Sequence, residues 1–216
     1  MADKYFAPIP AKAPPREIKT VEPEQKGERR VFVKKASVST PNVMLAYHIP
    51  ASSHKDNYAL DLLAAILGEG NSSRLYQSLV NNQIALGAET YMPESFDPNL
   101  FYIYGVAAAD IDAAQLEQSM LAEITKVSAN GVTVAELEKA KNLRLMDFYR
   151  TMETINGKAN TIGTYELFKG SYEKLFTAPE EYNKVTPEDL QRVASQYFIR
   201  ANRTVGVLAA EEELDQ

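Results

Sequence analysis

The sequence predicts an α+β fold in which an antiparallel-rich β-sheet carries helices packed on one face. Predicted strands come in pairs and predicted helices in runs, without the strict strand–helix alternation of a parallel α/β fold. The 216 residues, 45% of them hydrophobic, suffice for one large domain with a sizeable core. We expect this single domain to span residues 29–210, between a Pro-rich linker or arm at 1–28 and an acidic tail at 211–216.

The expected arm is marked by its proline content. Residues 1–28 contain five of the eleven prolines, mixed with charged residues. This composition is typical of an extended linker, not of a folded element. A free-standing protein rarely begins in this way, so we expect the sequence to be part of a longer polypeptide. The tail at 211–216 is expected to fray.

The first strands are recognised by their β-branched and aromatic residues. Two of them are predicted at residues 29–36 and 43–50, and two more at 86–92 and 100–107. A turn containing Pro and Asp joins the second pair at 93–98. Because these two strands are so close in sequence, we expect them to be antiparallel neighbours.

Between the two strand pairs lie two predicted helices joined by a Gly-rich segment. Asp56 is expected to cap the first helix, over 56–67, and the second is expected over 74–82. Glycine permits a positive φ or a close backbone approach, and serine can cap the next helix. The residues available for these roles in the joint are Gly68, Gly70, Ser72 and Ser73.

The second half of the chain is mainly helical, and most of its helices have a recognisable start. The expected helices span 113–129, 134–151, 155–168 and 187–197, with a short helical piece at 172–176 before Pro179 and a final strand at 203–209. Capping boxes and a Pro at the first helical position mark helix starts. These signals are Asp112 with Gln115, Thr133 with Glu136, and Thr186 with Pro187.

Charge and composition exclude several classes of function. The chain has 23 basic and 29 acidic residues, a net charge of −6, and no basic cluster, so we expect no nucleic-acid binding. It has no cysteine, which rules out disulfides, thiolate zinc sites and cysteine nucleophiles. No window approaches the roughly 18 apolar residues of a membrane-spanning helix. The absence of cysteine does not decide between a bacterial periplasm or envelope and a cytoplasm.

The two histidines do not form a zinc motif. His48 and His54 are six residues apart across a predicted strand-to-helix loop, whereas a helical zinc site places two histidines in H-E-x-x-H or H-x-x-E-H spacing. A metal pair is the weaker alternative to two ordinary loop-flanking histidines. The Gly-rich joint matches neither a G-x-S-x-G nucleophile turn nor a phosphate-binding loop. We therefore expect no catalytic residue and no metal ligand in this chain.

Four residues are candidates for binding a substrate: Arg74, Tyr76, Tyr102 and Tyr104. Two residues apart on a helix, Arg74 and Tyr76 point about 200° apart, so both cannot face one ligand. The alternative is that one packs and the other pairs with a local carboxylate. Tyr102 and Tyr104 share one face of their predicted strand. That face either lies under helices or lines a binding surface.

Several segments, in order along nearly the whole chain, resemble the C-terminal half of the pitrilysin/insulinase family of zinc peptidases, which includes the mitochondrial processing peptidase. These segments are G-E-G-N-S-S-R-L-Y (68–76), L-G-A-E-T-Y (86–91), D-P-N-L-F-Y-I-Y (97–104), G-V-T-V-A-E-L-E-K-A-K (131–141), V-T-P-E-D-L-Q-R-V-A-S-Q-Y-F (185–198) and N-R-T-V-G-V-L (202–208). K-Y-F-A-P-I-P at 4–10 is similar to the linker after the family's catalytic domain.

The resemblance implies a duplicated α+β domain whose two halves enclose a chamber like a clamshell. The first half carries H-x-x-E-H, a distal glutamate ligand and the zinc-bound water, and the second helps to close the chamber and bind an extended peptide. This sequence matches only the second half, so no catalytic residue carries over. Several members also have an Arg and a Tyr that hold substrate. The matching region here, 100–111, has Tyr102 and Tyr104 but no Arg.

The expected function is therefore that of a non-catalytic C-terminal domain of a zinc-dependent metalloendopeptidase, inactive alone. Its expected partners are a half bearing H-x-x-E-H, in the same chain or another subunit, and a peptide substrate. Zinc is expected in that catalytic half and no cofactor in this chain. The alternative is a structural or scaffolding homologue with no proteolytic role, next to a half that also lacks H-x-x-E-H.

Overall fold

The computed structural model describes residues 2–10, 12–13 and 22–210 of the chain, so the expected tail at 211–216 lies outside the described residues. The strands are β1 (Arg29–Lys34), β2 (Asn42–Ile49), β3 (Ala85–Tyr91), β4 (Asn99–Ala107) and β5 (Arg203–Ala209). The helices are α1 (Ala2–Phe6), α2 (Asn57–Gly68), α3 (Ala113–Asn130), α4 (Val134–Met152), α5 (Ile155–Phe168), α6 (Lys174–Lys184) and α7 (Pro187–Tyr197), with a π-helical turn η1 (Tyr76–Val80) and a 3₁₀ turn η2 (Arg200–Asn202).

The five strands form one mixed sheet in the order β1-β5-β2-β4-β3. Of the four pairings between described strands, that of β1 with β5 is parallel and the other three are antiparallel. This confirms the predicted antiparallel-rich sheet and the predicted pairing of β3 with β4. Among the residues that the structure describes, this order leaves β1 and β3 at the two edges, each with a neighbour on one side only.

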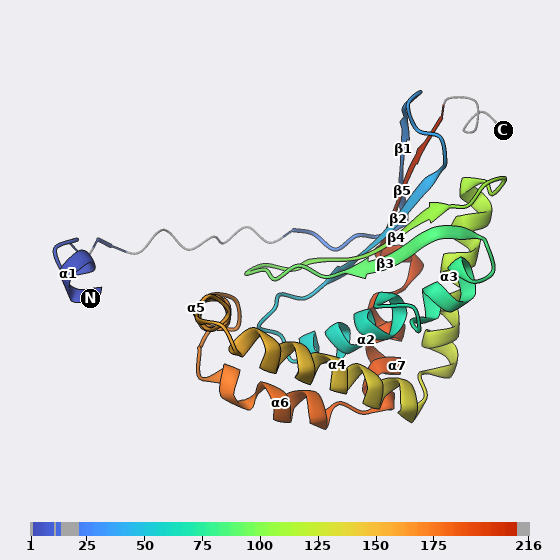
Figure 1. Ribbon diagram of the computed structural model, residues 1–216. Helices are drawn as coiled ribbons and strands as arrows, with labels where there is room; N and C mark the ends of the chain where they lie inside the picture. The colour runs from blue at the N-terminus through green and yellow to red at the C-terminus, as the bar shows by residue number, and fades with distance from the viewer. Residues whose placement is uncertain (1, 11, 14–21, 211–216) are drawn as a thin grey trace.

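The sheet has a covered inner face and an outer face. The helices of the domain lie on one side of the sheet, as predicted, and α1 stands apart from it (Figure 1). Alternate residues of the central strands, such as Leu45, Ile103 and Val205, are fully buried beneath α2, α3 and α7. The opposite, outer face carries among others Met44 and Tyr104, which are direct cross-strand partners.

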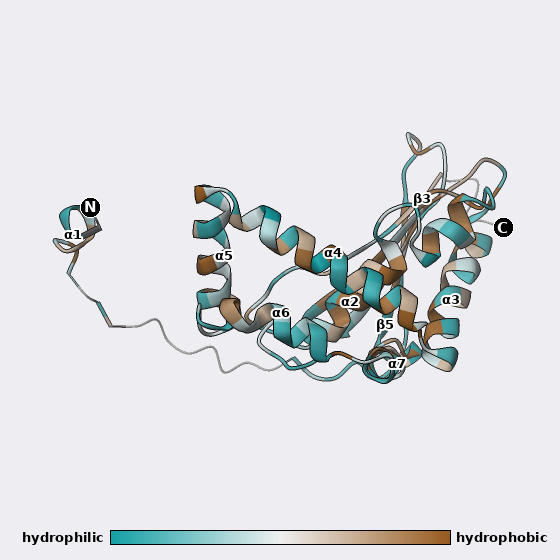
Figure 2. Cartoon of the chain, turned by 60° about the horizontal axis from the view of Figure 1, so that its bottom comes forward, coloured by the Kyte–Doolittle hydropathy of each residue, from teal (hydrophilic) through white to brown (hydrophobic). Residues whose placement is uncertain are grey.

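A second helical layer extends the domain away from the sheet. α4 contacts α2, α6 packs beside both, and α5 stands across the ends of α4 and α6 (Figure 2). A small second core of Tyr165, Leu175 and Ala178 holds this layer together. It also explains why α6 passes through Pro179, where the sequence predicted only a short piece before that proline. Packing of Leu175 and Ala178 compensates for the hydrogen bond that a helix loses at a proline.

The cap predictions are confirmed at three helices and wrong at one. Thr133 with Glu136 forms a full capping box at α4, and Thr186 caps α7. Asp112 accepts from the Gln115 N–H at the start of α3. Asp56 precedes α2 but makes no side-chain cap. Its carboxylate instead accepts bonds from Arg192 Nη2 at 2.7 Å and the Tyr197 hydroxyl at 2.8 Å on α7, because a buried charge gains more from a cation than from a backbone amide.

Candidate functional site

The Gly-rich joint between α2 and η1 is held against the edge strand β3. A Cβ on Gly68 would lie 2.4 Å from the Thr90 backbone nitrogen, so only glycine allows this approach of helix and strand. The Thr90 hydroxyl donates to the Ala64 carbonyl at 2.8 Å. Gly70 has a φ of 73°, which lets the chain turn before Ser73, whose Oγ accepts from the Tyr76 N–H at 3.4 Å. The joint therefore sets the position of β3.

Arg74 fastens the joint to the start of α4. Its Nε donates to Glu136 Oε1 at 2.6 Å, its Nη2 to Glu136 Oε2 at 2.9 Å and also to the Gly131 carbonyl at 3.2 Å. Glu136 at the same time accepts from the Thr133 N–H at 2.8 Å. The hydrogen bond with Arg74, supported by those with Thr133, lowers the pKa of Glu136 to about 2 although burial opposes it. Of the two roles weighed for Arg74, the structure thus has it pairing with a carboxylate.

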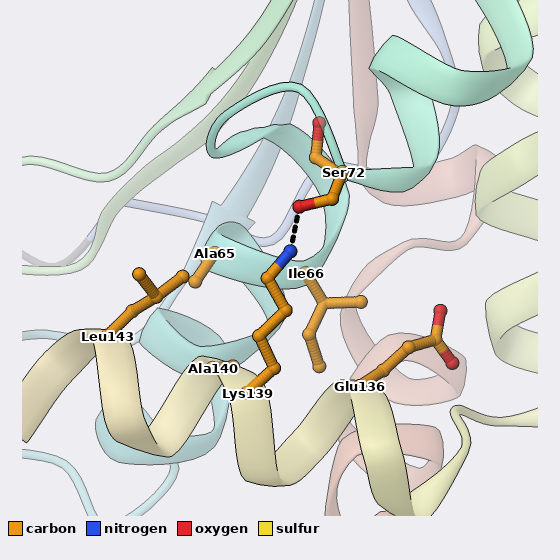
Figure 3. A pocket seen from close by; sticks show the side chains of 8 residues that line it. Ala65, Ile66, Ser72, Glu136, Lys139, Ala140 and Leu143 are labelled. Carbon is orange, nitrogen blue, oxygen red and sulfur yellow. Dashed lines mark hydrogen bonds between the residues drawn. The ribbon is translucent and has the colours of Figure 1, made fainter.

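Two hollows adjoin this joint, and neither has the features of an active site. The first lies between α2, the joint and α4, has room for about one water molecule, and is closed by a hydrogen bond from Lys139 to Ser72 (Figure 3). The second is a wide depression over η1, the C-terminal half of α3 and the start of α4. Its lining cations are paired, Arg74 with Glu136 and Lys126 with Glu123 at 2.5 Å. Such pairing leaves little attraction for an anionic ligand.

Tyr102 and Tyr104 lie on the outer face of β4, close to the open edge of the sheet. The Tyr102 ring stacks on that of Tyr91 in β3, with centroids 6.2 Å apart and planes inclined by 27°. The Tyr104 hydroxyl donates to Asn42 Oδ1 on β2. Cross-strand pairing also puts Glu89 of β3 directly beside Tyr104. Tyr102 thus forms an aromatic pair with Tyr91 of the edge strand, whereas Tyr104 is bound toward the centre of the sheet.

The structure does not bring all four candidate residues together. Arg74 contacts α4 on the helical side of the sheet, whereas Tyr102 and Tyr104 lie on the outer face. Tyr76 begins η1 and is half-buried. Tyr91 was not among the binding residues predicted from the sequence, although the period-two alternation of residues 85–91 could have placed it on the same face as the other strand tyrosines.

The histidines serve local contacts. His48 Nε2 lies 3.3 Å from Gln25 Oε1, and His54 Nδ1 accepts from the Asp56 N–H at 3.2 Å. Within the part of the chain that the structure describes, no three His, Cys, Asp or Glu side chains gather in a way that could hold a metal ion. The same residues include no helix long and apolar enough to cross a membrane.

One ion cluster links four separate segments behind the joint. Arg144 of α4 donates from Nε to Asp61 Oδ2 at 2.8 Å and from Nη1 to Glu69 Oε2 at 2.6 Å. The Tyr182 hydroxyl of α6 also donates to Asp61, at 2.6 Å. Burial alone would lower the pKa of Arg144, but the two carboxylates outweigh burial and raise it. Arg144 thus holds two carboxylates from α2 and the joint, and Asp61 is also held by Tyr182, which is the pattern of a structural tie.

Comparison with known proteins identifies the fold and its family. Residues 1–144 match the family described as "Peptidase M16 inactive domain". The zinc protease PqqE of Helicobacter pylori is 32% identical over 178 residues, covering 82% of this chain and 40% of the relative. The chain spans less than half the length of each of the curated relatives it matches.

Solved structures agree with this match. The crystal structure of a protease from Helicobacter pylori aligns with a TM-score of 0.88 at 30% identity, over 96% of this chain and 51% of that one. The inactive peptidase domain of a zinc protease from Bordetella parapertussis aligns with a TM-score of 0.72 at 27% identity, over 81% of this chain and 92% of that one. The resemblance inferred from the motifs is confirmed. The chain belongs to the peptidase M16 inactive-domain family, the non-catalytic C-terminal domain of M16 zinc proteases.

Proposed function

We propose that this domain closes the chamber of a zinc-dependent metalloendopeptidase and helps to bind its extended peptide substrate. The observation that carries the proposal is membership of an inactive peptidase-domain family whose curated relatives, about twice as long, include proteins named zinc proteases. The partner is then a half bearing H-x-x-E-H, in the same polypeptide or in another subunit. Zinc would bind in that half, and this chain would act on the peptide and not on the metal.

The peptide contact is proposed at the open edge of β3. Within the described part of the chain β3 pairs with β4 alone, so its other edge would offer backbone N–H and C=O groups to an added strand. Tyr91 lies on β3 itself, and Tyr102 and Tyr104 lie one strand further in on the same face, where they would supply apolar area for alternate side chains of the peptide. Gly68, packed on Thr90, holds the strand firmly from behind. A rigid, preformed edge lowers the ordering cost of binding.

Arg74 and Tyr76, the two candidate residues outside the sheet, would contribute to the proposed contact in different ways. Because the Arg74 guanidinium is occupied by Glu136, its proposed role is to hold the joint that supports β3. Tyr76, half-buried at the start of η1, would touch the peptide only beside that edge.

Replacing Tyr102 and Tyr104 by Ala in the assembled peptidase should raise KM several-fold. Tyr149→Ala, an exposed tyrosine of α4, is the matched control and should leave KM unchanged.

Two measurements test the peptidase role. The purified chain alone should bind no stoichiometric zinc and cleave no peptide, and zinc-dependent cleavage should appear when it is combined with its H-x-x-E-H half. Zinc-dependent cleavage by the chain alone that survives replacement of both His48 and His54 would refute the proposal. A neighbouring half that also lacks H-x-x-E-H would contradict it too, and would favour the scaffolding alternative.

We also propose that residues 29–210 fold as one unit, with 1–28 as a linker or arm and 211–216 as a tail. One continuous core from Val43 to Ala209 supports this division, and the Bordetella parapertussis relative was solved as a separate inactive domain. Two residues before the boundary nevertheless bind the domain, since Gln25 and Glu28 both contact Arg203. Limited trypsin digestion should therefore remove residues before Gln25 first. Earlier cleavage between 43 and 209 would contradict the division.

A further inference from the structure

The tip of the β3–β4 hairpin, residues 92–98, extends from the sheet toward α5 (Figure 1). Two side chains at the C-terminal end of α5 contact it. Lys169, the C-cap residue of α5, places its Nζ 3.0 Å from Glu94 Oε2. The ring centroids of Phe168 and Phe96 are 4.6 Å apart. The end of a helix in the second layer is thus bound to the tip of a hairpin in the sheet.

Lys169 is buried to a degree that its place in the helix does not require. The whole residue is 6% exposed, and lysine is almost never buried so far unless it is paired. A lysine at a helix C-terminus can stay in solvent, where the carbonyl groups at that end still attract it. The side chain of Lys169 instead reaches Glu94, whose own side chain is 41% exposed. The tie to the hairpin tip therefore accounts for the burial of this cation.

The hairpin tip has a second support in the loop that follows β2. The Ser95 N–H donates to Ser52 Oγ at 2.8 Å, and the Ser52 N–H donates to the Ser95 carbonyl at 3.2 Å. Ser52 lies between β2 and α2 and is buried. The tip thus bridges this loop and α5, and its position depends on both supports.

α5 is the weaker of the two supports. Of its 14 residues, all of them described, Tyr165 alone is buried, and Ile155 is 88% exposed. Gly163 lies in the helix interior, where glycine is less favourable than alanine. The core beneath α5 is the small second one of Tyr165, Leu175 and Ala178. Elements with so few buried apolar contacts open locally without global unfolding, so α5 should open more readily than the central strands.

We infer that Lys169 is a positioning residue for the edge of β3: through Glu94 it makes the hairpin tip open and close together with α5. Tyr91, the last residue of β3, is three residues before Glu94, so movement of the tip displaces the end of the edge where the peptide contact is proposed. The edge is then fully formed only while α5 is packed. This inference rests on the proposed peptide contact and adds to it the element of the helical layer that controls it.

Amide hydrogen exchange in the full chain measures the coupling. Gly163→Ala adds a methyl group with nothing within 4 Å of it, and should slow exchange of the α5 amides about two- to fivefold by helix propensity. The Ser95 amide should slow by the same factor. With Lys169→Met added, α5 should still respond and Ser95 should not. Leu175→Ala, which opens the second core, should speed exchange at both places in the chain that keeps Lys169. A Ser95 rate that follows α5 in neither Gly163→Ala nor Leu175→Ala would overturn the inference.

Lys158→Met is the matched control for Lys169→Met, because it removes an exposed cation from the same helix. Lys169→Met alone should speed exchange at Ser95 about fivefold, whereas Lys158→Met should leave it unchanged. The amides of β2 and β5 should keep their rates in both variants, which shows that the domain stays folded. Equal rates at Ser95 in the two variants would overturn the role of Lys169.

Kinetics of the assembled peptidase separate the role of Lys169 from the peptide contact itself. Lys169→Met should raise KM about threefold and leave kcat unchanged, and Lys169→Arg, which keeps the cation, should restore KM. An unchanged KM in Lys169→Met, in an enzyme whose KM rises when Tyr102 and Tyr104 are replaced, would overturn the positioning role alone. If neither change raises KM, the peptide contact at β3 fails and the positioning role fails with it.

Discussion

The ion pair between Arg74 and Glu136 gives a quantitative test of what holds the joint in place. Glu136→Gln removes the negative charge but keeps a side-chain acceptor for the Thr133 N–H, so the capping box survives. The substitution therefore measures the bidentate pair with Arg74 and not the helix cap. Because the joint supports β3, loss of the Arg74–Glu136 pair should lower the stability of the whole domain.

The size and pH dependence of the effect follow from the pKa of Glu136. A lowering from 4.5 to about 2 sets a ceiling of about 3.4 kcal/mol, since each pKa unit is worth about 1.36 kcal/mol. The side chain is 31% exposed, so solvent screening reduces the expected loss to about 1.5–2 kcal/mol. Since the folded-state pKa is depressed, this stability is fully present above pH 4.5 and is lost as the pH falls through about 2.

Urea unfolding followed by circular dichroism at several pH values measures this stability. At pH 7 Glu136→Gln should lower the free energy of unfolding by the stated amount, and the difference from the native chain should shrink steadily between pH 5 and pH 2. Glu138→Gln on the same helix removes a mostly exposed partner of Lys141 and should cost less than about 0.5 kcal/mol. A difference that stays constant with pH would refute the assignment of the stability to the Arg74–Glu136 pair.

Three further substitutions test other parts of the fold by the same urea titration. Arg144→Leu strips the cation from two partly buried carboxylates and should destabilise the domain by about 3 kcal/mol; a change below 1 kcal/mol would mean that the cluster is hydrated and weak. Gly68→Ala forces a methyl group onto Thr90 and should cost about 1–3 kcal/mol, with increased amide exchange in β3. Gly163→Ala, in the interior of α5 with open space around its Cβ position, should instead stabilise by about 0.5–1 kcal/mol. Destabilisation by Gly163→Ala would contradict the helical position assigned to that residue.

Local signals in the sequence accounted for most of the secondary structure. The strand pair β3 and β4 and the starts of α3, α4 and α7 could be predicted because alternation and capping act within a few residues. Asp56 shows where this reasoning fails. Its spacing is that of a helix cap, but its carboxylate is bound by Arg192, 136 residues later in the chain. Long-range charge pairing overrode a local preference.

The candidate site was less accessible to sequence reasoning than the fold. The face shared by Tyr102 and Tyr104 followed from strand periodicity alone. The partner of Arg74 did not, because Glu136 is 62 residues away and reaches it only when α4 packs beside the joint. The role of Gly68 was equally hidden, since its need for a small residue comes from β3 and not from its own turn.

The place of β5 in the sheet has a consequence for how the chain folds during synthesis. β5 is the last strand made, yet it lies between β1 and β2, the first two. The N-terminal strand thus has no neighbour to pair with until residues 203–209 have left the ribosome. Most contacts of the sheet's centre are therefore of long sequence separation, which favours slow folding. A chain truncated before Arg203 would release β1 entirely and leave β2 as a bare edge.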